Sequence, residues 1–287
     1  MSTPVTLAAP TAESSKPIVL IGPRRGLLDL DLWAVWQYRE LLYFLAWRET
    51  KVRYKQTMLG VAWAIFQPLL TVMIFAAIFG SFAKIPSDGL PYPVFAFAAL
   101  LPWTYFSEAT VRSSTSLVSD ASLLRKVYFP RLIIPLAAVI APIVDFALAF
   151  VVLFGMMRWY RVAPTWNALF LPLFLVLALA TALAVGLWLS ALNVKYRDVR
   201  HTVPFVMQVW MYASPIVYPV SLVPEQWRLL FALNPMTGVI EGFRWGLLGK
   251  QSPDFALIGA SAVVVVGLLF GGLVFFRRME RIFADVV

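Results

Sequence analysis

Few residues that could carry chemistry lie inside the long apolar stretches of this chain. Three ionisable side chains are found there: Glu108 and Arg112, four residues apart, and Asp145. A spacing of four residues places Glu108 and Arg112 on one face of a helix, where opposite charges can pair. Asp145 is a functional candidate, because a carboxylate inside a membrane is costly and usually faces the interior of a helix bundle. A structural hydrogen bond or a protonated acid is the alternative, since the sequence offers no second midplane acid or histidine for a proton relay.

Signatures of catalysis, metal binding and nucleotide binding are missing. The chain has no cysteine, which excludes disulfides, thiolate nucleophiles and Cys-based metal sites. His201 is the one histidine and has no acid cluster beside it, so neither a zinc site nor a Ser-His-Asp arrangement is expected. Arg244 stands where a phosphate-binding loop ending in Gly249 and Lys250 would need glycine. We therefore expect no catalytic residue, no metal site and no cofactor in this chain.

The polar residues are carried by apolar segments long enough to cross a membrane. The composition is 61% hydrophobic and 14% charged, whereas soluble domains have about 45–50% apolar and about 25% charged residues. A transmembrane helix needs about 20 apolar residues. The sequence predicts an all-α integral membrane protein, in which residues 58–287 form one domain. Its six transmembrane helices are expected at residues 58–82, 94–118, 132–157, 164–192, 202–223 and 255–276.

Positive charge alternates between the loops that connect these segments. If the amino terminus is inside, the loops on its side hold 17 Lys and Arg, the opposite loops hold six, and Arg112 remains within a span. Lys and Arg accumulate in cytoplasmic loops, so we expect a multi-pass membrane protein with both termini in the cytoplasm. The net charge of +9 then reflects topology and does not indicate nucleic-acid binding.

Two elements are expected before the first span. Residues 1–30, which begin with a stretch rich in Ala, Ser, Thr and Pro, are predicted to be a flexible cytoplasmic tail. Residues 31–57 are predicted to be an amphipathic helix in the plane of the membrane interface. Its aromatic stripe comprises Trp33, Trp36, Tyr43, Phe44 and Trp47, and its headgroup-facing cations are Arg39, Arg48, Lys51, Arg53 and Lys55. The sequence leaves open whether this helix is only a membrane anchor or also binds a partner.

The loop at residues 119–131 is short and basic and carries apolar side chains between its charges. Apolar groups exposed at a surface commonly contact a partner. Pro130 ends any helix there, so the loop is expected to hold a short rod of two or three turns. A solvated loop whose apolar groups dip into the membrane interface is the alternative.

Two apolar pieces, residues 225–233 and 236–248, lie between the fifth and sixth predicted spans, and neither is long enough to span. Asn234 and Pro235 divide them and are typical of a turn. The sequence predicts an extracytoplasmic hairpin of two short helices, covering a conduit. Glu241 and Arg244 are three residues apart and can pair on one helix face, and we interpret this pair as structural.

Aromatic residues are abundant in the outer half of the bundle. Phe75, Phe79 and Phe82 share an arc of about 60° at ideal helical spacing, and we expect them, with the turn at Asn234, to mark a substrate path. Further aromatic residues occur in the fifth predicted span but scatter around the helix: Phe205, Trp210, Tyr212 and Tyr218. Aromatic faces can contact the C–H faces of sugars, whereas a place in the core or in the interfacial belt is the alternative for each ring.

Several blocks in order make the chain resemble the permease subunits of polysaccharide-exporting ABC transporters. The resemblance covers about residues 35–280. Its blocks are Arg53-Tyr54-Lys55-Gln56-Thr57 with Leu59-Gly60, Trp63 and Pro68; Arg125-Lys126-Val127-Tyr128-Phe129-Pro130-Arg131; Asn193-Val194-Lys195-Tyr196-Arg197-Asp198-Val199; Ser214-Pro215 with Tyr218-Pro219; and Asn234-Pro235-Met236.

The resemblance implies a homodimer in the lipid of a bacterial cytoplasmic (inner) membrane that carries two copies of a separate ATPase subunit, which binds ATP and Mg. It also implies export of a lipid-linked polysaccharide, with O-antigen, capsule and teichoic acid as the possible classes. The implied ATPase-coupling residues are Leu123, Leu124, Arg125, Lys126, Tyr128, Phe129, Arg131, Tyr196, Arg197 and Asp198. The substrate-path residues are Phe75, Phe79, Phe82, Trp210, Tyr212, Tyr218 and Asn234.

Two other classes of protein stay open from the residues alone. A proton-coupled secondary carrier would be expected to show an inverted repeat and more than one buried acid, and no such repeat is visible. A membrane-embedded glycosyltransferase would need carboxylates near the interface, for which only Asp120 and Asp198 qualify, and weakly.

Overall fold

The computed structural model describes residues 32–55, 60–249 and 254–286, and no strand occurs within these ranges. The predicted tail at 1–30 lies outside them, as do residues 56–59, which join the predicted interface helix to the first span. In chain order the elements are α1 (Leu32–Gln37), α2 (Arg39–Lys55), α3 (Gly60–Phe75), the π-helix η1 (Ala76–Phe82), α4 (Tyr92–Ser119), α5 (Ala121–Lys126), α6 (Ile133–Ile140), α7 (Ile143–Trp159), the 3-10 helix η2 (Trp166–Phe170), α8 (Leu171–Lys195), α9 (Val199–Tyr212), the 3-10 turn η3 (Val220–Leu222), α10 (Glu225–Ala232), α11 (Pro235–Leu248) and α12 (Phe255–Val286).

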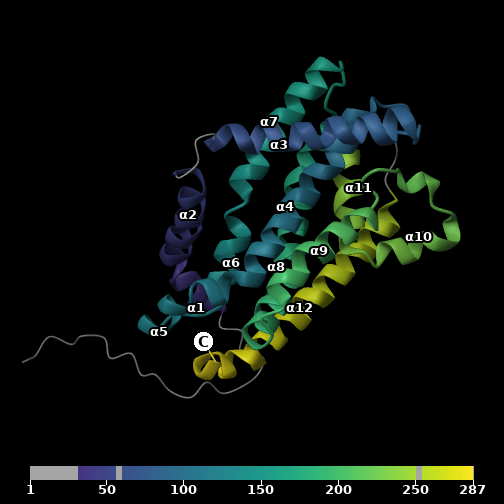
Figure 1. The fold of residues 1–287 in the computed structure, drawn as a ribbon. Coiled ribbons are helices and arrows are strands. Elements are labelled where there is room, and N and C mark those ends of the chain that lie inside the picture. Colours follow the sequence, from purple (N-terminus) through teal and green to yellow (C-terminus); the bar gives the residue numbers. More distant parts are fainter. Residues whose placement is uncertain (1–31, 56–59, 250–253, 287) are drawn as a thin grey trace, which may run out of the picture.

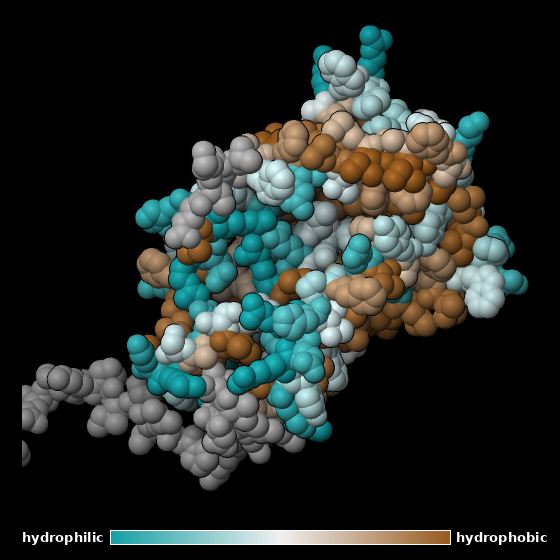
Figure 2. All heavy atoms as spheres, in the orientation of Figure 1, coloured by the Kyte–Doolittle hydropathy of each residue, from teal (hydrophilic) through white to brown (hydrophobic). Residues whose placement is uncertain are grey.

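Five helical segments within the described ranges are long and apolar enough to cross a membrane. Each overlaps one of the six predicted spans. The segments are Ile65–Phe82, Tyr92–Ser119, Ile133–Trp159, Trp166–Lys195 and Phe255–Glu280. Apolar side chains form a continuous band along α3 at the surface (Figure 2). The prediction of an all-α membrane protein is therefore confirmed.

The predicted fifth span is wrong as one continuous helix over residues 202–223. Its helix α9 has 14 residues and ends at Tyr212, which gives a length of about 21 Å against a hydrocarbon core of about 30 Å. Pro215 follows and has no N–H to continue the helix, while the Ser214 hydroxyl donates to the Trp210 carbonyl at 2.9 Å. The chain then runs without regular helix to η3.

The long helix α4 forms the centre of the bundle and packs against α6, α7, α8, α9 and α11. In Figure 1, α4, α8, α9 and α12 run obliquely in a similar direction, and α3 crosses above them. Small residues on α4, such as Ala98, Ala99 and Ala109, are completely buried and allow the neighbouring helices to approach closely. A second apolar cluster lies where α2, α6, α8 and α12 meet, around Ile133 and Phe276.

The two short helices that flank Asn234-Pro235 are present as α10 and α11, but α11 is inserted into the bundle. It packs against α4, α8 and α12 and is buried along almost its whole length. Gly242 permits this approach, because a Cβ there would lie 2.2 Å from the Phe174 ring. Asn234 caps the helix by accepting from the Met236 N–H at 3.1 Å, and Gly249 ends it with a φ of 62°.

A buried arginine fixes α11 to the chain segment that follows α9. Arg244 is 7% exposed and donates to the carbonyls of Ile216 at 2.7 Å and Tyr218 at 3.3 Å. It also pairs with Glu241 at 3.3 Å, and its guanidinium carbon lies 3.7 Å from the centre of the Phe95 ring. The predicted pairing of Glu241 with Arg244 is confirmed.

Candidate functional site

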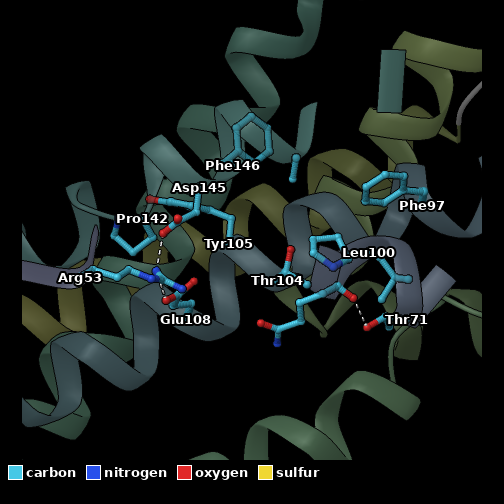
Figure 3. A pocket seen from close by; sticks show the side chains of 13 residues that line it. Arg53, Thr71, Phe97, Leu100, Thr104, Tyr105, Glu108, Pro142, Asp145 and Phe146 are labelled. Atoms are coloured by element: carbon cyan, nitrogen blue, oxygen red, sulfur yellow. Dashed lines mark hydrogen bonds and ion pairs between the residues drawn. The ribbon is translucent and has the colours of Figure 1, made fainter. Parts of the chain in front are cut away.

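A cluster of charged side chains lies inside the membrane domain, where the end of α2 reaches α4 and α7. One Arg53 guanidinium nitrogen pairs with both the Glu108 carboxylate of α4 and the Asp145 carboxylate of α7 (Figure 3). The sequence placed Arg53 among cations that face lipid headgroups, and this is wrong for Arg53. Its long side chain instead turns toward the bundle, where it reaches the carboxylates of Glu108 and Asp145.

Neighbouring groups extend this contact into a network. The Tyr54 hydroxyl donates to Asp145, and burial, together with this hydrogen bond, raises the pKa of Tyr54. The hydroxyl therefore stays protonated and acts as a donor. Arg112 donates to Glu108 at 3.0 Å, one turn away on α4, and lies 3.7 Å from Glu49 of α2. The expected pairing of Glu108 with Arg112 is confirmed, and Asp145 has two partners on α2.

A cavity of about 100 Å³ opens beside Arg53, between α3, α4 and α7. Its polar end carries Arg53, Glu108 and Asp145 together with hydroxyl and amide groups, and its apolar end is formed by aromatic and aliphatic side chains (Figure 3). The remaining lining residues are Gln67, Pro68, Thr71, Phe97, Leu100, Thr104, Tyr105, Pro142, Phe146 and Ala149. On the surface, hydrophilic side chains lie set back in a hollow below the apolar band of α3 (Figure 2).

A second cavity of about 240 Å³ lies under α2, where it faces α4 and α6. Arg48 and Glu49 line it from α2, and Arg112 and Asp120 line it from α4. Arg48 donates to both carboxylate oxygens of Asp120, at 2.8 and 2.7 Å. The two cavities are thus connected by one set of charged side chains along a single face of α2.

This arrangement offers hydrogen-bond donors and acceptors to a hydroxyl-rich ligand and does not assemble a metal centre. Among the described residues, no group of three or more His, Cys, Asp or Glu side chains could hold a metal ion. Each of the three carboxylates at Glu49, Glu108 and Asp145 faces an arginine instead.

Comparison with known proteins assigns this architecture to a transporter family. The profile of the family described as "ABC-2 type transporter" matches residues 40–248. The chain belongs to the ABC-2 type transporter family. It is 30% identical to the O-antigen export system permease protein RfbA of Myxococcus xanthus, over 88% of this chain and 97% of that protein. It is 27% identical to RfbA of Klebsiella pneumoniae, over 86% and 95%, and 25% identical to the polysialic acid transport protein KpsM of Escherichia coli, over 82% and 91%.

Within this transporter subunit, most side chains that were predicted to couple to an ATPase lie at the surface. Tyr128 is 62% exposed and Tyr196 is 52% exposed. The other exposed members are Arg125, Lys126, Arg197 and Asp198, and the half-buried members are Leu123, Leu124 and Arg131. Phe129 differs from the prediction because it is 5% exposed and belongs to the core cluster of α6, α8 and α12. It anchors the loop and is not available to a partner.

The predicted aromatic stripe does not form one surface. Phe75 is buried and packs edge to face on the half-buried Phe79, with ring centres 5.4 Å apart, whereas Phe82 is 84% exposed. The cause is the π-helix η1, in which the Ala83 N–H donates to the Ile78 carbonyl five residues earlier. This wider turn invalidates the angular spacing from which the stripe was predicted.

Asn234 and Trp210, which were predicted to line a substrate path, contact each other inside the protein. The Trp210 indole N–H donates to the Asn234 side-chain oxygen at 3.1 Å, and the Asn234 amide donates to the Ser214 hydroxyl at 2.9 Å. Tyr218 packs on Phe231 and is half-buried. Tyr212 is 52% exposed and is the member of this group at α9 that can meet a ligand.

Sequence reasoning missed the α2 side of the site. Arg48 and Arg53 were predicted only as headgroup-facing cations, Arg53 and Tyr54 were recognised as the start of a family block, and Glu49 was not singled out. The available signal was the spacing of Glu49 and Arg53, four residues apart, which places opposite charges on one face of a helix. That face then needs a complementary partner, and α4 supplies one through Glu108 and Arg112.

Proposed function

We propose that this chain is the transmembrane subunit of an ATP-driven exporter that moves a lipid-linked polysaccharide across the cytoplasmic membrane. The observation that carries the proposal is the match to export permeases along nearly their whole length, including 97% of the Myxococcus relative. The polar cavity at Arg53, Glu108 and Asp145 supports it, because a hydroxyl-rich glycan needs hydrogen-bonding groups inside an otherwise apolar bundle.

We further propose that the glycan is an O-antigen, since the two O-antigen export relatives are more similar to this chain than the polysialic acid relative is. Two chains would form the path together, with the exposed faces of α3 and α9 toward each other. Both termini would lie in the cytoplasm, in agreement with the distribution of Lys and Arg.

Energy would come from a separate ATP-binding subunit that docks on α5 and on the turn between α8 and α9. The exposed Tyr128 is the aromatic side chain that such a subunit can bury, because Phe129 is already in the core. Aromatic anchors in partner pockets often contribute about 2 kcal/mol or more to binding. The side chains of Tyr196 and Arg197 would complete the docking surface.

The test is export by the chain with its ATPase, reconstituted in vesicles that contain the lipid-linked glycan. The chain alone should hydrolyse no ATP, whereas the complex should hydrolyse ATP and export glycan. Tyr128→Ala should weaken ATPase co-purification by roughly thirty-fold, which corresponds to about 2 kcal/mol. Tyr160→Ala, which removes another exposed tyrosine far along the chain, is the matched control. ATP turnover by the chain alone, or glycan export that is independent of ATP, would contradict the proposal.

A further inference from the structure

The cavity between α3, α4 and α7 is amphipathic. Arg53, Glu108 and Asp145 lie at one end, and Phe97 and Leu100 lie at the other (Figure 3). Its volume is about 100 Å³, whereas a cavity needs only about 10–15 Å³ to hold one water molecule. In the space-filling view, hydrophilic side chains lie set back in a hollow below the apolar band of α3 (Figure 2). Such a cavity suits a small polar group that is attached to an apolar chain.

The carboxylate of Glu108 has an unused acceptor at the polar end. Its Oε1 atom accepts from Arg53 and from two nitrogens of Arg112. Its Oε2 atom accepts no hydrogen bond from any residue that the structure describes. The side chain lines the cavity and is 30% exposed, so a donor that enters the cavity can approach this carboxylate.

The guanidinium of Arg53 has unused donors at the same end. Its Nη1 atom donates to both Glu108 and Asp145, while within the described part of the chain Nε and Nη2 donate to no acceptor. The planar fork of an arginine can bind a phosphate or carboxylate group through such N–H groups. An anionic group of a ligand can therefore bind Arg53 close to the free oxygen of Glu108.

The charges of the described residues around the cavity leave a negative excess. The polar end holds one cation, Arg53, and the two carboxylates of Glu108 and Asp145. Arg112 also pairs with Glu108 but is shared with Glu49. Charged groups inside a membrane protein are normally paired. A ligand with a positive and a negative group satisfies both Glu108 and Arg53, whereas an anion alone adds to the negative excess.

We propose that this cavity binds the headgroup of a zwitterionic phospholipid with a primary ammonium group, of the phosphatidylethanolamine class. The ammonium donates to Glu108 Oε2, and the phosphate accepts from the free nitrogens of Arg53. The glycerol end lies toward Phe97 and Leu100, and the acyl chains run along the apolar surface of α3. The inference goes beyond the proposed function, because this lipid comes from the surrounding bilayer and occupies the cavity when no glycan is there.

The first test measures lipid binding to the purified full-length chain by native mass spectrometry. The probes share their acyl chains and differ in the headgroup: phosphatidylethanolamine, its N-methyl and N,N-dimethyl derivatives, phosphatidylcholine and phosphatidylglycerol. Phosphatidylethanolamine should bind about tenfold more tightly than phosphatidylcholine, which has the same charges but no N–H, because one charge-assisted hydrogen bond is lost. The methylated derivatives should fall between them in the order of the N–H groups that they lose. Equal binding of the two zwitterionic lipids, or tightest binding of phosphatidylglycerol, would overturn the inference.

Two variants separate the two contacts. Glu108→Gln keeps the shape of the side chain but removes its charge, so the preference for phosphatidylethanolamine over phosphatidylcholine should fall to within about threefold. Arg53→Gln removes donors to the phosphate that both lipids carry, so it should weaken both and leave their ratio unchanged. Glu225→Gln, at a side chain on α10 that is 89% exposed, is the matched control and should alter neither quantity. If Glu108→Gln kept the full preference, or weakened both lipids equally, the ammonium site would be refuted.

A second measurement keeps the lipid in a bilayer. A ligand that binds the folded state stabilises it, so the wild-type chain should melt at a higher temperature in nanodiscs that contain phosphatidylethanolamine than in phosphatidylcholine alone. Glu108→Gln should lose most of this difference, and Glu225→Gln should keep it. A difference that Glu108→Gln retains would come from the bilayer as a whole and would contradict the site. Neither measurement needs ATP or glycan, whereas the proposed function fails if export is absent, so the two failures are distinguishable.

Discussion

Arg244 and Arg53 both reach into the membrane domain, and their surroundings differ in nearly every respect. Arg244 is 7% exposed, stacks on Phe95 and donates to two backbone carbonyls. Arg53 has a side chain that is 33% exposed, pairs with carboxylates of α4 and α7 and borders a cavity. Arg244 fixes one arrangement of the backbone, whereas Arg53 holds a contact that another cation, a ligand or water can replace.

A charged side chain inside the bilayer costs free energy, and the surroundings of Arg244 and Arg53 offset this cost in two different ways. Near Arg244 the protein supplies fixed dipoles and an aromatic face, so removal of the arginine leaves those groups buried and unsatisfied. Near Arg53 the carboxylates of Glu108 and Asp145 lie beside a cavity, so water can solvate them when the arginine is removed. The first strategy stabilises the fold, and the second permits function.

The largest effect on stability is expected for a substitution of the buried arginine, Arg244. Arg244→Ala should destabilise the protein by about 3–5 kcal/mol, because it leaves the partly buried carboxylate of Glu241 without its partner and the carbonyls of Ile216 and Tyr218 without their donor. The measurement is the melting of the detergent-solubilised protein, followed by size-exclusion chromatography. Arg228→Ala, at a more exposed arginine, is the control. An Arg244→Ala protein with normal melting would show that this arginine does not stabilise the fold.

A smaller effect is expected at the cap of α11. Asn234→Ala removes the oxygen that accepts from Met236 N–H and Trp210 and should cost about 1–2 kcal/mol. Asn234→Asp keeps that oxygen and loses only the donor to Ser214, so it should retain more stability than the alanine variant. Thermal melts of the two proteins check the order. Equal losses in both would assign the effect to the Ser214 contact in place of the cap.

The smallest stability effect is expected on the α2 side. Arg53→Gln should change the free energy of unfolding by about 1 kcal/mol or less, yet lower glycan export strongly, because the polar end of the cavity loses its cation. Lys51→Gln, at an exposed position of the same helix, should affect neither quantity. Melting and export measured on the same membranes separate the two effects. A destabilisation as large as that of Arg244→Ala would abolish the distinction between the two arginines.

The fold was predictable wherever it depends on local hydrophobicity. Five spans follow from apolar runs, and the turn between α10 and α11 follows from Asn234-Pro235. Pro215 is a local signal for the end of α9, but the irregular continuation was not predictable, because it is stabilised by Arg244, which lies 28 residues after the Ile216 carbonyl that it contacts. The insertion of α11 likewise depends on Gly242 and on a ring of another helix.

The site was predictable in part for the same reason. Glu108 and Asp145 stand out because charges are rare in apolar segments. Arg53 lies 92 residues from Asp145 in sequence, and only the packing of α2 on α6 brings them together. The aromatic stripe failed because ideal helical spacing was assumed across residues 76–82, where the backbone is a π-helix.

The depth of α11 within the bundle also constrains how the protein is made. At 14 residues, or about 21 Å, α11 is too short to be inserted by the translocation machinery as a span. Its contacts with α4 and α8 can form during synthesis, but those with α12 must wait until the last helix has emerged. A nascent chain that stops before residue 255 therefore leaves α11, which carries Glu241 and Arg244, without one of the helices that bury it. Assembly of the subunit is completed from its carboxyl end, and truncation there should direct the whole chain to degradation.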